Sequence, residues 1–316
     1  MTRGAAGAAG ALALGVLAAA AGVARADTPR DTPSAIEVDR DEAPPGRSEL
    51  GFDGGAPVDG WGATLGAGWL EQPLVLGTAG GGETRPVRRR ETLALGGAIA
   101  LGRSVVVDAR VAAAHQVGDR LRPLEARALD RFVPGDLRLG VRVRATGGAR
   151  GAVFVRGDLT LPTGDDGDFA GEASWSLAWR LIGRLAYPRG IRIAASAGLR
   201  LRGSEVVIGD RLVGDELTFA LGVVVPVPPV RPLWCDAEQV KLAAEAVGGL
   251  GDDVGSGRGP SPVEARLGLV TRPRPWLEIG LRLARGLSDE IGAPRARVTL
   301  ELTYRGTGVV IPHRPE

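Results

Sequence analysis

Apolar side chains alternate with polar or small ones in twelve separate runs between Trp61 and Tyr304. The clearest run is residues 136–144, in which every odd-numbered residue is Leu or Val and all but one of the even-numbered residues are charged. Because successive side chains of a β-strand point to opposite faces, each run predicts a strand with one apolar face. The twelve runs are 61–69, 93–101, 105–113, 137–143, 153–161, 175–181, 191–201, 217–225, 242–246, 263–269, 277–283 and 296–304.

The apolar face of these runs carries no charged residue, although 24% of the chain is charged. Random placement over the roughly 55 positions of that face would give about 13 charges. A charge that faces lipid near the middle of a bilayer costs ~2–4 kcal/mol, whereas a charge on a water-exposed face costs little. We therefore predict an all-β fold, a transmembrane antiparallel up-and-down β-barrel of about twelve strands over residues 60–304. A large soluble β protein also alternates and is the competing interpretation.

The spacing of the runs supports this prediction, because barrels of this class have long extracellular loops and short periplasmic turns. With an even number of strands, both ends of the chain lie on the periplasmic side. The segment 226–239 is long for a periplasmic turn and is an exception. The expected long loops are residues 70–91, 115–135, 162–173, 203–216, 250–262 and 284–295, and the expected short turns are 102–103, 146–151, 186–190 and 271–275.

The N-terminus has the layout of a secretory signal peptide over residues 1–26. Arg3 precedes a run of Ala, Gly, Leu and Val, and Ala24-Arg25-Ala26 forms a small-x-small cleavage pattern. We expect export through the Sec pathway, cleavage after Ala26 and a location in the outer membrane of a Gram-negative cell. Residues 27–59 are rich in Asp, Glu, Pro and Gly and read as a periplasmic lead-in, or as a plug that folds into the barrel. Residues 305–316 form a short tail.

Charge and composition exclude several classes of function. The formal charge is +2, and both excess charges, Arg3 and Arg25, lie in the signal segment, so the remaining chain is neutral and lacks the surplus expected of a nucleic-acid-binding protein. With only His115, His313 and Cys235 available, no catalytic set or zinc site is evident, so we expect no enzyme activity, no metal and no cofactor. The acidic stretch 165–172 could hold calcium, but a solvated loop is the simpler interpretation.

The polar face of the runs should line the lumen, with thirteen basic and seven acidic residues on it, an excess of 13 − 7 = +6 by our count. These charges either pair into ladders that brace a narrow interior, or they make a pore that favours anions. The residues expected to line the lumen include Arg110, Arg138, Arg142, Arg144, Arg156, Asp158, Arg180, Arg192, Arg200, Arg202, Arg282, Arg297 and Glu301.

Four further arginines, Arg85, Arg88, Arg89 and Arg90, fall in the first expected extracellular loop. They could bind lipopolysaccharide phosphates, or they could be a solvated charge run.

Short turn motifs carry a family resemblance. The stretches 135–142, 161–165, 169–172, 214–217, 285–288 and 291–294 resemble those of outer-membrane transporter-like barrels. The chain is similar to the barrels that form the N-terminal half of some OmpA-family proteins, and more loosely to the barrels of aromatic-compound degradation within the FadL-like group. The resemblance spans about residues 51–304 and implies passage of small, often hydrophobic molecules. No peptidoglycan-binding domain follows Tyr304, so cell-wall anchoring is not implied.

Together these patterns predict a passive outer-membrane channel or transporter for small molecules. The alternatives are an envelope barrel with no open pore, or a periplasmic or surface-exposed binding protein. The expected partners are outer-membrane lipid and lipopolysaccharide, the barrel-assembly machinery, which would read the last strand ending at Tyr304, and an unknown permeant, but no nucleic acid.

Overall fold

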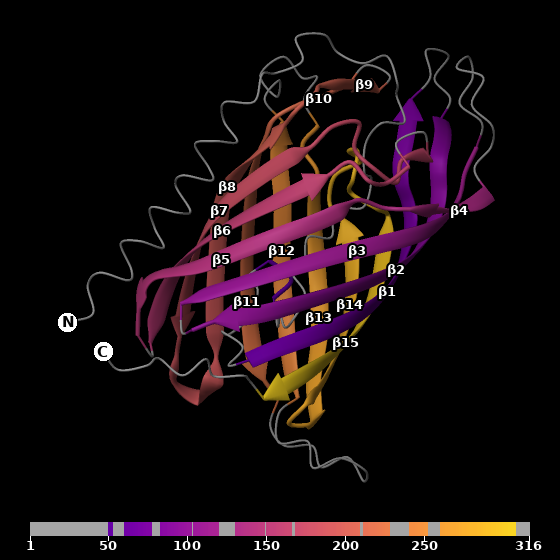
Figure 1. The fold of residues 1–316 in the computed structure, drawn as a ribbon. Coiled ribbons are helices and arrows are strands. Elements are labelled where there is room, and N and C mark those ends of the chain that lie inside the picture. The colour runs from indigo at the N-terminus through magenta and orange to yellow at the C-terminus, as the bar shows by residue number, and fades with distance from the viewer. Residues whose placement is uncertain are drawn as a thin grey trace.

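The computed structural model describes residues 50–52, 60–77, 83–102, 104–119, 130–148, 150–165, 168–208, 211–227, 240–251 and 260–307. Within these residues the protein is a β-barrel (Figure 1). The described residues contain no helix that is long and apolar enough to cross a membrane. The elements are β1 (Gly60–Gly77), β2 (Glu83–Leu101), β3 (Val105–Val117), β4 (Asp130–Pro134), β5 (Leu137–Gly147), β6 (Gly151–Leu161), β7 (Ser176–Ala186), the 3₁₀ turn η2 (Pro188–Gly190), β8 (Arg192–Arg202), β9 (Val206–Ile208), β10 (Arg211–Val213), β11 (Glu216–Pro226), β12 (Lys241–Gly251), β13 (Val263–Arg274), β14 (Leu277–Gly286) and β15 (Ala296–Thr307).

The main sheet closes on itself with every neighbouring pair antiparallel. Strands β4 and β5 pair with successive parts of β3 and so share one position, which leaves twelve positions around the barrel. The seam that closes the barrel joins β1 to β15, from the pair Gly60–Thr307 to the pair Glu71–Ala296, and the two strands lie side by side in Figure 1. The prediction of a twelve-stranded antiparallel barrel is therefore confirmed, and each predicted run lies on its own strand.

The barrel has two distinct ends. We call the end where β1 begins and β15 ends the terminal end, and the opposite one, with the long connections, the loop end. The small hairpin of β9 and β10 lies at the loop end, at the top of Figure 1. Three aromatic side chains meet on the outer surface of the terminal end, where the Tyr304 ring centroid is 5.5 Å from that of Trp61 and 5.8 Å from that of Trp276.

The two faces of the wall reverse the usual arrangement of a soluble protein. On β2, Leu93 and Leu95 are 53% and 59% exposed, while the intervening Ala94 is buried. On β14, Leu281 and Leu283 are exposed and Arg282 between them is only 4% exposed. Large apolar side chains therefore face outward and charged ones face inward, as expected for strands surrounded by hydrocarbon.

Several of the expected connections were wrong in extent: the loop 203–216 contains β9 and β10, most of the turn 271–275 belongs to β13, and two loops differ most. Residues 70–77 and 83–91 continue β1 and β2 as a long hairpin, and residues 115–117 and 130–134 extend β3 and form β4. Beyond the apolar band a strand needs no apolar outer face, so its sequence can be as charged as a loop and still pair. The long segment 226–239 lies outside the described residues except for Pro226 and Val227.

Candidate functional site

Buried ion pairs lie along two parts of the inner wall of the barrel. On one side Arg156 donates to both carboxylate oxygens of Asp108, at 2.8 and 2.9 Å, and also binds Asp158. Arg180 reaches the same Asp158 at 2.7 Å. The Arg156 and Asp108 side chains are 3% and 5% exposed, so both charges have lost most of their hydration. Their mutual attraction offsets part of the cost of that loss.

A second group of ion pairs lies on the opposite side, on β12 to β15. Glu264 accepts from Arg266 at 2.7 Å and pairs with Arg297 at 3.1 Å. Arg282 contacts Glu301 at 2.5 Å and lies 3.8 Å from Glu245. We call these six residues and the four on the other side the lumen network, in which five arginines face five carboxylates and the charge is balanced.

A short N-terminal segment, residues 50–52, lies inside the barrel. The Gly51 N–H points at the Glu245 carboxylate, with its nitrogen 2.9 and 3.0 Å from the two oxygens. Leu50 and Phe52 pack among small and β-branched inward-facing residues, which are Ala194, Ala220, Val224 and Ala243. A Cβ atom at Gly222 would lie 2.7 Å from Leu50, so the absence of a side chain there makes room for the segment. The rest of the expected lead-in lies outside the described residues.

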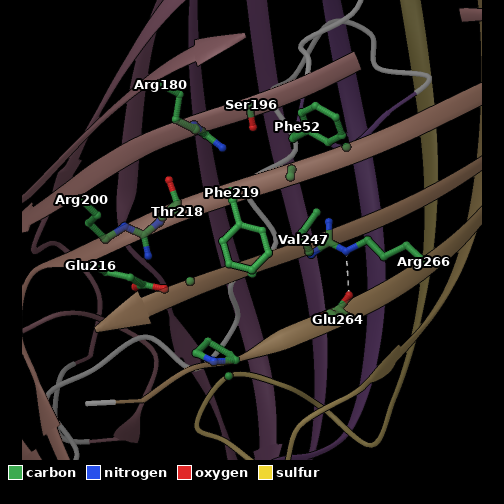
Figure 2. Close-up of a pocket in the computed structure, with 16 residues that line it drawn as sticks. Phe52, Arg180, Ser196, Arg200, Glu216, Thr218, Phe219, Val247, Glu264 and Arg266 are labelled. Carbon is green, nitrogen blue, oxygen red and sulfur yellow. Dashed lines mark hydrogen bonds and ion pairs between the residues drawn. The ribbon is translucent and has the colours of Figure 1, made fainter. Parts of the chain in front are cut away.

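Beside Phe52 a recess of about 590 Å³, counted with the space open to solvent, reaches the barrel wall. Figure 2 shows Phe52, Arg180, Ser196 and Val247 around it, with the Glu264–Arg266 ion pair at one side. Its lining therefore combines an aromatic ring with charged groups, a surface that can contact both the apolar and the ionic parts of a small solute.

The terminal end of the lumen is richer in positive charge. Glu278 accepts from Arg272 at 2.8 Å and from Arg305 at 2.5 Å. Arg192 and Lys241, the first residues of β8 and β12, are close enough for their charges to interact with this group. We call these five residues the terminal-end cluster. Farther round the same end, Arg142 of β5 and Arg184 of β7 flank Phe154 of β6. The guanidinium carbon of each lies 5.0 Å from the centroid of the Phe154 ring.

A hydrophobic cap covers part of the loop end. Its buried side chains come from the β1–β2 hairpin, from the β6–β7 and β14–β15 connections, and from β9 and β10. Arg211 of β10 pairs with Glu290 at 3.1 Å, and the Gly292 N–H donates to the Pro73 carbonyl oxygen at 3.3 Å, so ionic and backbone contacts also join these segments. We call this the loop-end cap, and its buried residues are Leu74, Val87, Phe169, Val206, Ile208, Val213 and Ile291.

The β6–β7 connection is fastened to the wall by Asp136, which lies between β4 and β5. Its two oxygens accept the N–H groups of Gly164 and Glu172, both at 2.8 Å. Burial raises the pKa of Asp136, against the two backbone hydrogen bonds, which lower it. A Cβ atom at Gly171 would lie 2.9 Å from the Asp136 carboxylate, so the close approach requires glycine. Three of the stretches that carried the family resemblance therefore meet at Asp136. We call Asp136, Gly164 and Glu172, joined by these two hydrogen bonds, the Asp136 interlock.

The expected lumen residues all lie on inward-facing positions of their strands. Some of them belong to the lumen network, while Arg202 lies near the loop end between Glu216 and Glu172, at 3.4 and 3.5 Å. The buried ones are Arg142, Arg156, Arg180, Arg202, Arg282 and Arg297, and the partly exposed ones are Arg110, Arg138, Arg144, Asp158, Arg192, Arg200 and Glu301.

The four arginines expected on a surface loop lie instead on β2. Arg85, Arg88 and Arg89 are at least partly exposed, and Arg85 and Arg89 pair with Glu83 and Glu91. The prediction was wrong for Arg90, which is 1% exposed and donates to the Phe169 carbonyl oxygen at 3.0 Å. Its position in the strand turns it inward, beneath the β6–β7 connection.

Sequence reasoning missed several charged lumen residues because they lie just outside the ends of the predicted runs. Arg184, Arg272 and Arg305 continue the inward-facing parity of β7, β13 and β15 toward the terminal end, and Glu216 opens β11. Extending the runs on β7 and β13 by three residues, and those on β15 and β11 by one, would have found them. Among the described residues there is no group of three or more His, Cys, Asp or Glu side chains that could hold a metal ion.

Comparisons with known proteins place the fold. No protein family matches the sequence and no curated protein matches it either. The structure is similar to an outer-membrane channel of the COG4313 group from Pseudomonas putida F1, with 13% identity, a TM-score of 0.56 and coverage of 82% of this chain and 99% of that one. The NanC porin is a looser match, with 5% identity, a TM-score of 0.47 and coverage of 77% and 98%. The chain therefore has the fold of a twelve-stranded outer-membrane β-barrel.

Proposed function

We propose that the protein is a passive outer-membrane channel for small molecules, exported by a cleaved signal peptide over residues 1–26. The observation that carries the proposal is the combination of an apolar outer wall with a charged lumen that keeps open space beside Phe52. A tube of this kind gives polar solutes a route that avoids hydrocarbon. The likeness to an outer-membrane channel supports the fold on which this proposal rests.

Solute uptake tests the proposal directly. The purified chain, reconstituted in liposomes, should admit small anionic and aromatic solutes faster than protein-free liposomes do. Liposomes that carry the same protein after unfolding by heat serve as the control for membrane damage. If folded and unfolded samples leak equally, the protein is not a channel.

The second candidate is an envelope barrel without an open pore, and two observations favour it. The lumen network lines the inner wall on two sides, and residues 50–52 occupy part of the space between them. This alternative predicts membrane insertion with no solute uptake. A periplasmic or surface-exposed binding protein would instead fractionate without detergent, and heat-modifiable migration in a gel would be absent.

An interaction with lipopolysaccharide is a further part of the proposal. Arg88 and Arg89 are exposed and Arg85 is partly exposed near the loop end of β2, where phosphate groups could reach them. Glu83 and Glu91 neutralise part of this surface. Loss of lipopolysaccharide co-purification in a triple Arg→Gln variant at these positions would support the contact.

A further inference from the structure

The recess beside Phe52 lies on the inner wall formed by β7, β8 and β11 to β13. Its volume of about 590 Å³, counted with the space open to solvent, is within the range of small-molecule sites, about 300–1,000 Å³. Phe52, Ala220 and Val247 line it with apolar surface, and all three belong to one hydrophobic cluster or pack against it. This part of the recess can therefore hold the apolar part of a solute.

Charged side chains lie at two sides of this apolar surface. Figure 2 shows Arg200 and Glu216 at one side of the recess and Glu264 and Arg266 at the other. Arg200 and Glu216 are opposite each other in the register of β8 and β11, and Arg266 donates to Glu264 at 2.7 Å. Both sides therefore present N–H donors together with carboxylate acceptors.

Both carboxylates at the recess have ionic partners. Glu264 pairs with Arg297 as well as with Arg266, and Glu216 lies 3.4 Å from Arg202. A solute with a net charge would compete with these buried ion pairs, and their separation is costly. A neutral solute would not, because guanidinium and carboxylate groups each have several hydrogen-bonding positions and can bind a hydroxyl group while they stay paired. The charge balance of the recess therefore favours an uncharged ligand.

From this arrangement we propose that the recess is a binding site for a neutral monosaccharide that passes through the lumen. A pyranose ring has apolar C–H faces and a rim of hydroxyl groups, which both donate and accept hydrogen bonds. Its C–H face contacts Phe52 and Val247, and its hydroxyl groups reach the charged side chains at the two sides. The inference rests on the proposed channel function only for transport of the sugar, not for binding itself.

Saturation-transfer NMR with D-glucose tests the site in the full chain, folded in a detergent that has no sugar headgroup. We expect D-glucose to receive saturation from the folded protein and not from protein unfolded by heat, and a titration gives the affinity. D-Glucuronate, in which a carboxylate replaces the hydroxymethyl group, is the comparison. It should bind on the order of tenfold more weakly, because its charge must compete with the existing ion pairs.

A variant that fills the recess locates the binding. Val247→Phe places a ring in the space beside Phe52 and should weaken D-glucose binding on the order of tenfold or more. The matched control is Val106→Phe, which makes the same change at an inward-facing valine of β3 outside the recess, and it should bind as the wild type does. Heat-modifiable gel migration verifies that both variants are folded. The comparison of the two sugars needs only the wild-type protein, so it decides the inference even if Val247→Phe does not fold.

Three results would overturn the inference: no saturation of D-glucose by the folded wild type, binding of D-glucuronate as tight as that of D-glucose, or equal affinities of the two valine variants for D-glucose. The channel proposal is judged separately, by uptake into liposomes. Binding of D-glucose without solute uptake would leave the site and remove the channel, and uptake without D-glucose binding would do the reverse.

Discussion

Arg156 and Asp108 form their two hydrogen bonds across an intervening strand, directly over Gly140. The two residues lie on β6 and β3, and β5 between them places Gly140 opposite Asp108 in the register. A Cβ atom at Gly140 would lie 2.5 Å from Asp108 Oδ1. The absence of a side chain at this one position therefore allows the buried ion pair to form.

Replacement of Gly140 should disrupt this pair. We expect Gly140→Ala to lower the free energy of unfolding by roughly 2–4 kcal/mol, because two buried charges lose their close contact. Urea unfolding of the barrel in liposomes measures the change. Gly157→Ala on the neighbouring strand is the control, since a Cβ atom there meets nothing within 4 Å. Equal stability of the two variants would contradict the role of Gly140.

Residues 50–52 should limit flow through the lumen if the protein is a channel. Because Phe52 and Leu50 are buried against the inner wall, the double variant Leu50→Ala/Phe52→Ala should admit larger solutes and conduct more current in planar bilayers. Phe132→Ala removes a ring that is 65% exposed and provides the comparison. Unchanged conductance in the double variant would show that this segment does not restrict the pore.

A charge on the outer wall should prevent assembly. Leu139, Val141 and Leu300 are exposed on the outer face, and an arginine at any of them should cost ~2–4 kcal/mol near the centre of a bilayer. The amount of heat-modifiable protein in the membrane fraction reports assembly. Leu287→Arg, at a 65% exposed site beyond the end of β14, should assemble normally. Normal membrane levels of Leu139→Arg would refute the assignment of this face to lipid.

The Asp136 interlock should respond to pH in a defined direction. Since burial raises the pKa of Asp136, the folded state takes up a proton at higher pH than the unfolded state does. The stabilising contribution is complete below the unfolded pKa and is lost as the pH rises through the raised folded pKa. Relative to Asp136→Asn, the wild type should therefore gain unfolding free energy as the pH falls from neutral toward 4. Denaturant titrations of both proteins across this range measure the difference, and a decrease on acidification would contradict the pKa direction.

The strands could be predicted from the sequence because each must keep charges such as Arg142 away from the outer face, which leaves a period of two. The pairing of Arg156 with Asp108 could not be predicted, because parity places a side chain inside the barrel without giving its partner on a neighbouring strand. The β1–β2 extension was missed because alternation is not required beyond the apolar band. The loop-end cap depends on contacts among connections far apart in the chain. No local sequence pattern predicts that Phe169 and Ile291 are buried in the same cluster.

The seam between β1 and β15 constrains how the protein can be made. One edge of residues 61–71 pairs with residues 89–99, but the other pairs with residues 296–306, so the first strand stays half-paired until these last residues have been synthesised. Pairing over such a sequence separation is slow to form, and an open sheet edge invites association with other chains. The newly made chain must therefore be kept from aggregating between its synthesis and the closure of the barrel. A copy truncated before the final strand would remain an unclosed, aggregation-prone sheet.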